Sequence, residues 1–263
     1  MHRGGAGYQA AYAVYPAENY GIGSKPMPPR KDDEAAAEAA DDGGRAGGAP
    51  ALLLANKVAR RKRRYAQEGM RRTAEALLLV ARHGHPHVLL AQHGPGQFRL
   101  PGGRVRPGED DVDALRRKLA KQLSPDDPSL AHAWEVAGDA LVGAWWRTGW
   151  ETDAGAALYP YLPPHATRPK EALRLFLVAL PERGFFAVPR DRRLVAVPLF
   201  ELHDNPARYG PVLAAVPSML SRFRLNVVAA TAAPPGGVGG AAAGAVGGGG
   251  GGAQPQDFDP YIA

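Results

Sequence analysis

The amino-acid sequence predicts a mixed α/β fold in which helices pack on a β-sheet. Short apolar runs bounded by Gly and Pro dominate the middle of the chain, and helical patterns lie between and after them. The regularly patterned region, residues 51–230, is long enough to bury a sizeable hydrophobic core. We therefore expect one medium-sized domain in which strands outnumber helices.

The first two apolar runs predict a β-hairpin. Residues 74–81 and 88–91 are apolar, and a polar stretch that contains Gly84 and Pro86 joins them. Several of the later apolar runs are apolar on both faces, which favours central positions in the sheet. Those further strands are expected at 140–146, 174–180, 185–188 and 194–199.

Three segments have the features of helices. Residues 51–67 contain neither Pro nor Gly and end close to Gly69. In 109–123 the apolar residues recur at steps of three and four, and acidic residues crowd the first turn, where they complement the helix dipole. Residues 210–223 are expected to form a closing helix.

The segments around the patterned region have a composition that cannot support a packed core. Residues 31–50 are acidic and Ala-rich and then Gly-rich, and 231–263 contain a long run of Gly and Ala. We expect 1–13 and 231–263 to be disordered, 14–30 to form an N-terminal arm, and 31–50 to be a low-complexity linker.

Charge and composition restrict the class of protein. The formal net charge is +6 and the pI about 9.6, which favours a polyanionic partner. The chain has no Cys, which excludes disulfides and Cys-ligated zinc. Because no apolar run approaches the length of a membrane helix and no hydrophobic signal core is present, we expect a soluble protein that is not secreted.

Two polar clusters leave alternatives open. The cationic run 57–64 is interpreted as a nuclear-import patch, a nucleic-acid contact or a solvated helix face. His83, His85 and His87 alternate and could ligate a metal, but the Gly and Pro between them indicate a turn.

The segment that begins at Gly103 resembles the Nudix box, GX5EX7REUXEEXGU. Five residues separate Gly103 from Glu109, and seven separate Glu109 from Arg117. Catalytic Nudix proteins then place glutamates on one helix face to hold magnesium. An ammonium group offers donors and no acceptor, so lysines at that face would repel magnesium rather than bind it, and we expect no metal, no cofactor and no catalysis. Those positions are Lys118, Lys121 and Gln122 here.

Motifs along most of the chain resemble one non-catalytic Nudix family, the small subunit of pre-mRNA cleavage factor Im (cleavage and polyadenylation specificity factor subunit 5). Among them are VYPAENYGIGSK (14–25), LPGGRVRPGED (100–110), GAWWR (143–147) and YPYLPPHATRPKE (159–171). The resemblance implies a Nudix-type α/β/α sandwich with a mixed sheet. It further implies a nuclear homodimer that binds single-stranded RNA containing UGUA and recruits a larger subunit with an RNA-recognition domain.

The family's RNA-contacting positions can be transferred one by one. Its helical arginine falls on Lys57, its base-reading glutamate on Glu75, and its C-terminal backbone contact on Tyr209 and Gly210. A carboxylate can accept hydrogen bonds from guanine, and an aromatic ring can stack on an unpaired base. The family's loop before LPGG falls on Gly96, Gln97 and Phe98.

This sequence departs from the family pattern in that loop. The usual stacking aromatic aligns with Gln97, so either Phe98 stacks after a shift of one residue or Gln97 contacts the base by hydrogen bonds. An upstream glutamate of the family falls near Arg30. Glu75 could also be a structural ion-pair partner and Tyr209 a buried anchor.

Two other functions remain possible. A divergent Nudix hydrolase of nucleoside diphosphate derivatives would hold its metal through Glu109, although a single carboxylate at a helix start is more simply a structural residue. A protein-interaction scaffold would not bind RNA. Trp145 and Trp146 are expected in core or dimer packing rather than as base platforms.

Overall fold

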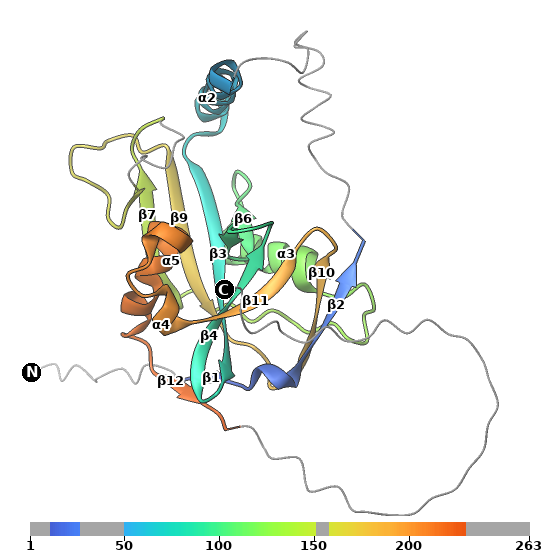
Figure 1. The fold of residues 1–263 in the computed structure, drawn as a ribbon. Coiled ribbons are helices and arrows are strands. Elements are labelled where there is room, and N and C mark those ends of the chain that lie inside the picture. The colour runs from blue at the N-terminus through green and yellow to red at the C-terminus, as the bar shows by residue number, and fades with distance from the viewer. Residues whose placement is uncertain (1–10, 27–49, 151–157, 230–263) are drawn as a thin grey trace, which may run out of the picture.

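An eight-stranded mixed sheet with the strand order β11-β4-β3-β9-β7-β8 forms the centre of the molecule, and β5 and β6 pair with β4 and β3 (Figure 1). The computed structural model describes residues 11–26, 50–150 and 158–229. The strands of this sheet are β3 (Arg71–Arg82), β4 (His85–Gln92), β5 (Phe98–Arg99), β6 (Gly102–Arg104), β7 (Leu141–Arg147), β8 (Leu158–Tyr159), β9 (Glu171–Val178) and β11 (Arg193–Pro198). The helices are α2 (Pro50–Glu68), α3 (Asp111–Leu123), α4 (Leu199–Leu202) and α5 (Pro206–Leu220).

The first two strands of the sheet form the predicted hairpin. β3 and β4 are antiparallel, and His83 and Gly84 in the turn have positive φ angles of 50° and 75°, as a two-residue hairpin turn requires. His87 Nδ1 donates to the carbonyl oxygen of His85 at 2.9 Å. Within the described ranges, no group of three or more His, Cys, Asp or Glu side chains is arranged to hold a metal.

Helices cover the sheet on both faces and produce three layers (Figure 1). Side chains alternate along β3, so Leu78 packs in one apolar cluster with Leu115 of α3, whereas Leu77 packs in the other with Val216 of α5. The apolar residues of α3 recur every 3.6 residues and those on one face of β3 every second residue, so the apolar side of the helix packs on one apolar face of the strand. The predicted α/β sandwich and the helices at 51–67 and 109–123 are confirmed.

The two last predicted strands are not central. β10 (Gly184–Pro189) pairs with β2 (Tyr20–Lys25) in a separate two-stranded parallel sheet, and β11 is an edge strand of the main sheet. The apolar residues of β11 are nevertheless buried on both faces, since Leu194 packs in the cluster that contains Leu115 and Val195 in the cluster that contains Val216, whereas β10 packs against the N-terminal arm. Phe186 of β10 is fully buried and stacks on Tyr20, with ring centroids 5.4 Å apart.

The N-terminal arm contributes strands and core side chains to the domain. It consists of β1 (Tyr12–Val14), η1 (Ala17–Asn19) and β2, and β1 pairs with β12 (Leu225–Val227), a strand that the sequence pattern did not predict. β1 begins inside the segment expected to be disordered. Of the other residues for which disorder was predicted, 1–10 and 231–263 lie outside the described residues. Most of the predicted linker 31–50 also lies outside them, and its last residue, Pro50, begins α2.

The closing helix begins earlier than predicted and is broken. α5 starts at Pro206, and Gly210 interrupts it with φ 81° and ψ 166°. A left-handed φ at this position favours Gly, and Pro211 lacks the N–H that would continue the helical hydrogen bonds. None of the helices in the described ranges is both long and apolar enough to cross a membrane.

Lys25 links the arm to the end of α3. Its side chain is buried, and Nζ donates to the carbonyl oxygens of Lys121 (2.9 Å) and Ser124 (2.8 Å). These carbonyls lie at the C-terminal end of the helix, where backbone acceptors lack helical partners and a cation complements the dipole. Burial lowers the pKa of Lys25, and the nearby Asp126 opposes that effect.

We predict that Lys25→Met lowers the free energy of unfolding by about 2 kcal/mol, because two charge-assisted hydrogen bonds are lost and two carbonyls are left without a donor. Urea denaturation measures the effect. Lys62→Met, which changes an exposed lysine of α2, is the matched control and should change the value by less than about 0.5 kcal/mol. Equal stabilities of the two variants would contradict a capping role for Lys25.

Candidate RNA-binding site

One face of β3 changes from apolar to polar toward its N-terminal end. Arg71, Thr73 and Glu75 lie on the same face as Leu77, which packs in the cluster beneath α5. Glu75 is partly buried, and its neighbour across the sheet is Leu175 of β9. The fold therefore places a carboxyl group at the boundary between the core and the polar end of the strand.

The carboxyl group of Glu75 has a perturbed protonation equilibrium. Burial raises its pKa to about 7, and the attraction of Arg99 and Arg71 does not offset burial, while Glu171 raises the pKa further. Desolvation disfavours the charged form unless a partner compensates. A close structural ion pair, the alternative interpretation of Glu75, would instead have lowered the pKa.

The turn before the Nudix-box helix is held against β3 at Glu75. A Cβ at Gly102 would lie 2.3 Å from the carbonyl oxygen of Ala74 and 2.7 Å from Cα of Glu75, so no other residue fits there. Gln122 of α3 fixes the same glycine from the other side. Its Nε2 donates to the carbonyl oxygen of Gly102 (2.7 Å), and its Oε1 accepts from the Gly102 N–H (3.0 Å).

The loop before this turn brings Phe98 to the last helix. The rings of Phe98 and Tyr209 have centroids 5.0 Å apart and are tilted by 46°. Phe98 is partly buried, whereas Gln97 is exposed and follows Gly96, whose φ is 69°. Of the two alternatives for base stacking, the geometry presents Phe98 as part of an aromatic pair and Gln97 as a side chain in solvent.

Tyr209 is an anchor in this structure. It is buried, and its hydroxyl group donates to the carboxylate of Glu201. Burial, followed by this hydrogen bond, raises the pKa of Tyr209 above its ordinary value. Gly210, the next residue, redirects the backbone at the break in α5.

The remaining predicted residues lie apart from this group. Lys57 belongs to α2, but its side chain is outside the described residues, as is Arg30. Trp145 of β7 is buried in the core cluster with Leu175 and Tyr209, which confirms its packing role. Trp146 is partly buried.

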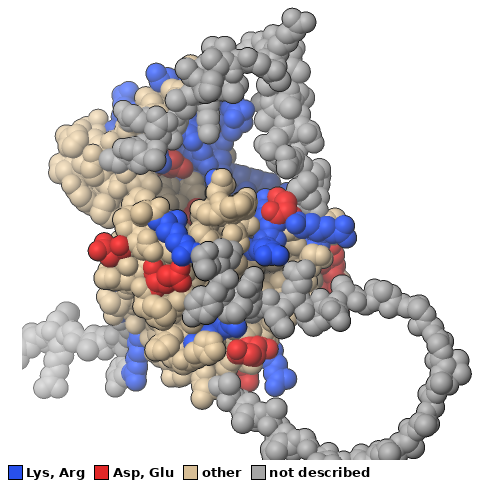
Figure 2. Space-filling model, in the orientation of Figure 1, with Lys and Arg blue, Asp and Glu red and all other residues tan. Residues whose placement is uncertain are grey.

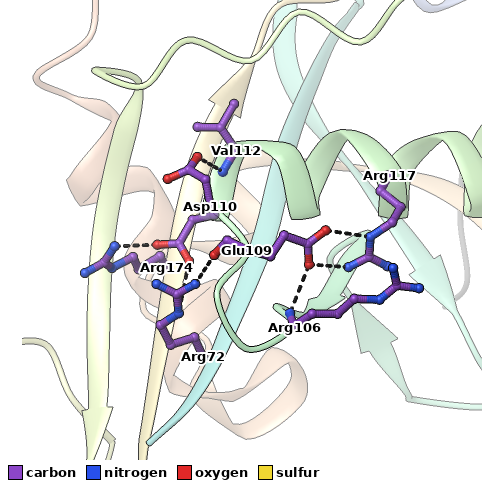
Figure 3. A network of polar contacts seen from close by, with 8 residues as sticks. Arg72, Arg106, Glu109, Asp110, Val112, Arg117 and Arg174 are labelled. Atoms are coloured by element: carbon purple, nitrogen blue, oxygen red, sulfur yellow. Dashed lines mark hydrogen bonds and ion pairs between the residues drawn. The ribbon is translucent and has the colours of Figure 1, made fainter.

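The surviving glutamate of the Nudix box is engaged within the protein (Figure 3). Glu109 accepts two hydrogen bonds from Arg117, both at 2.7 Å, and one from the backbone N–H of Arg106 at 2.9 Å. The hydrogen bonds from Arg117 are the main reason that the pKa of Glu109 falls to about 2. The spacing of the motif thus allows Arg117, within α3, to bind Glu109, which lies just before the helix begins.

Sequence reasoning missed a second carboxylate in the same turn. Asp111 is buried and forms ion pairs with Arg72 and Arg174, from two strands of the sheet (Figure 3). Asp110 beside it caps the helix, since its side chain accepts from the N–H of Val112 at 2.9 Å. Each of the three consecutive acids is therefore engaged by a different part of the protein, where the sequence indicated only a favourable helix dipole.

The three positions of the box where the catalytic motif has glutamates make other contacts here. Gln122 holds the backbone of Gly102, as described. Lys118 lies along the turn, where its Nζ would be 3.5 Å from a Cβ at Gly103. Lys121 is exposed, and its carbonyl oxygen accepts from Lys25.

Comparison with known proteins gives the family. The model of the NUDIX_2 family, described as nucleotide hydrolase, matches residues 10–223. The chain is 48% identical over 166 residues to the pre-mRNA cleavage factor Im 25 kDa subunit 2 of Arabidopsis thaliana, covering 63% of this chain and 80% of the relative. It is 46% identical over 164 residues to subunit 1 of the same plant, covering 62% and 71%.

A third relative has a related name. The chain is 44% identical over 160 residues to the cleavage and polyadenylation specificity factor subunit 5 of Dictyostelium discoideum, covering 60% of this chain and 76% of the relative. The chain therefore belongs to the Nudix family and, within it, to the family of cleavage factor Im 25 kDa subunits. The expected Nudix-type fold is confirmed.

We predict that Gln122→Glu, which restores the residue type of a catalytic box, destabilises the protein by about 1–3 kcal/mol at pH 7. The carboxylate would face the carbonyl oxygen of Gly102 without a donor between them. Gln67→Glu on the exposed side of α2 is the matched control. Thermal unfolding measures both variants, and an unchanged or raised melting temperature for Gln122→Glu would show that Gln122 is not a structural clamp.

Proposed function

We propose that this chain is a non-catalytic, RNA-binding subunit of the nuclear machinery that cleaves and polyadenylates pre-mRNA. It binds single-stranded RNA of the UGUA type, acts as a homodimer and recruits a larger cleavage-factor subunit with an RNA-recognition domain. The names of its relatives support the process. The family resemblance supports the RNA word, the dimer and the partner.

The observation that carries this proposal is the convergence of three transferred residues on one face of the sheet. Glu75 lies on the face of β3 that continues into the apolar cluster containing Phe98 and Tyr209. A carboxylate on the same sheet face as a partly exposed aromatic ring suits an unstacked base, which offers an edge to hydrogen-bond and a face to stack. Stacking contributes about 1–3 kcal/mol per base.

The chemistry of the box supports binding over hydrolysis. Glu109 would have to exchange its bidentate Arg117 partner for a metal, and a cation at Lys118 lies beside the same turn. Magnesium needs several oxygen ligands in an octahedron, which the substituted positions 118, 121 and 122 do not offer. The proposal therefore assigns the box a structural role.

For the proposed site we predict that Glu75→Ala reduces discrimination between UGUA RNA and a control RNA with its guanine replaced by about tenfold, because base-edge contacts specify the sequence. Lys57→Ala should weaken binding of both RNAs by a similar factor, since phosphate contacts carry no sequence information. Fluorescence anisotropy at two salt concentrations measures the dissociation constants. Equal losses on both RNAs for Glu75→Ala would contradict a base-reading role.

The raised pKa of Glu75 predicts a pH dependence. With a pKa of about 7 in the free protein, the carboxyl group is mostly protonated at pH 6 and mostly ionised at pH 8. The ionised form accepts from two guanine donors, so the dissociation constant for UGUA RNA should fall about tenfold between these pH values. Glu75→Gln should show a flat profile over the same range, and identical profiles for the two proteins would remove Glu75 from base recognition.

A further inference from the structure

A cationic cavity opens at the end of the sheet nearest α2, beyond the candidate base-reading residues. Its volume is about 150 Å³. Figure 2 shows Lys and Arg side chains gathered at this end of the molecule. The cavity is lined by Arg60, Arg61, Arg64, Tyr65 and Gly69 from the end of α2, and by Arg71, Arg104, Arg147, Gly149, Trp150, Lys170 and Glu171.

Positive charge in this cavity exceeds negative charge. Among the residues that the structure describes, seven cationic side chains and one carboxylate, Glu171, line it. Glu171 is shared by Arg71 and Arg147, each at 3.3 Å. Arg104 pairs with Glu68, and within the part of the chain that the structure describes no carboxylate forms an ion pair with Arg61 or Arg64.

The electrostatics of Arg61 reflect this surplus. Burial lowers its pKa first, and repulsion from Arg71, Arg147 and Arg60 lowers it further, whereas only Glu171 acts in the opposite direction. Like charges held together in a cleft raise the local concentration of anions. Such a cluster gains free energy when a phosphate enters, because guanidinium groups match phosphate oxygens in pairs.

Aromatic rings form one wall and position a further cation. Tyr65 and Trp150 meet edge to face, with centroids 5.3 Å apart. Nζ of Lys170 lies 4.7 Å from the centroid of Tyr65 and 5.2 Å from that of Trp150. This packing connects α2 to the segments that follow β7 and precede β9. The cationic side chains of the cavity come from α2, from β3, β6 and β7, and from the residue before β9.

The cavity and Glu75 lie along the same strand face. Arg71 is four residues before Glu75 in β3, on the same face, and a strand rises about 3.3 Å per residue, which separates the two positions by about 13 Å. Their charges are coupled, since Arg71 and Glu171 both influence the pKa of Glu75. An RNA strand whose base lies at Glu75 would have neighbouring phosphates within reach of the cavity.

We propose that this cavity binds the phosphate groups of RNA nucleotides that flank the word read at Glu75. The proposal rests on the proposed RNA-binding function and extends it. The UGUA word is recognised at Glu75, and the flanking nucleotides add affinity that does not depend on their sequence. Phosphate contacts position and strengthen binding, and base contacts select.

The test uses the full chain and two RNAs. The first RNA consists of the UGUA word alone, and the second has the same word with three added nucleotides on each side. Arg61→Gln/Arg64→Gln removes two cavity cations, and Lys62→Gln/Arg63→Gln removes two exposed cations of the same helix that do not line the cavity. Anisotropy at several salt concentrations gives the affinities and their salt slopes. The melting temperature of each variant checks folding.

In the wild type we expect the flanks to tighten binding at least tenfold. Arg61→Gln/Arg64→Gln should lose that gain, leave word-only binding within about twofold of the wild type and reduce the salt slope for the long RNA by about 1.4, since each cation contributes about 0.7 for single strands. Lys62→Gln/Arg63→Gln should retain most of the gain.

Several outcomes would overturn this inference. Equal effects of the two double variants would show a diffuse charge contribution with no defined cavity. If the wild type binds the UGUA word but added nucleotides do not increase the affinity, the phosphate-binding role of the cavity is refuted and the proposed function is not. If the wild type does not bind the word, the proposed function itself is refuted. Binding of inorganic tripolyphosphate that is lost in Arg61→Gln/Arg64→Gln, without any flank effect, would assign the cavity to a small polyanion and not to RNA.

Discussion

The contact between Gly102 and the backbone of β3 is the constraint on which the candidate site depends. Any Cβ at Gly102 would overlap Ala74 and Glu75, so the turn before α3 approaches the strand only because glycine is present. Gln122 then satisfies both backbone groups of the same glycine. The position of the box helix, the loop that carries Phe98 and the carboxyl group of Glu75 all follow from this contact.

Several side chains of the Nudix box form contacts within the protein. Its glutamate is bound by Arg117, and the acids that follow cap the helix or pair with arginines of the sheet. An amide at position 122 can donate and accept at once, whereas a carboxylate can only accept. Gln122, at a position where the catalytic motif has a glutamate, here binds the backbone of Gly102.

In the function that we propose, the sheet face beneath this turn divides two tasks between neighbouring regions. Near α5, the aromatic pair of Phe98 and Tyr209 lies against the apolar core, where a base can be desolvated. Near α2, arginine side chains line the cavity, and their positive charge would attract a phosphate group. Glu75 lies between the two regions, and its raised pKa records that it is partly desolvated without a close cationic partner.

The sequence by itself determined the hairpin, the amphipathic box helix, the cationic helix and the spacing of Glu109 and Arg117, because these features depend on local periodicity and on residues a few positions apart. Tertiary structure decided the rest. The burial of β10 comes from the distant arm, and the break at Gly210 and the pairing of Phe98 with Tyr209 depend on how α5 packs. The cavity combines α2 with the ends of four strands, and Gln122 meets Gly102 across 20 residues. Such contacts join segments that no local pattern relates, since only chain folding brings them within reach.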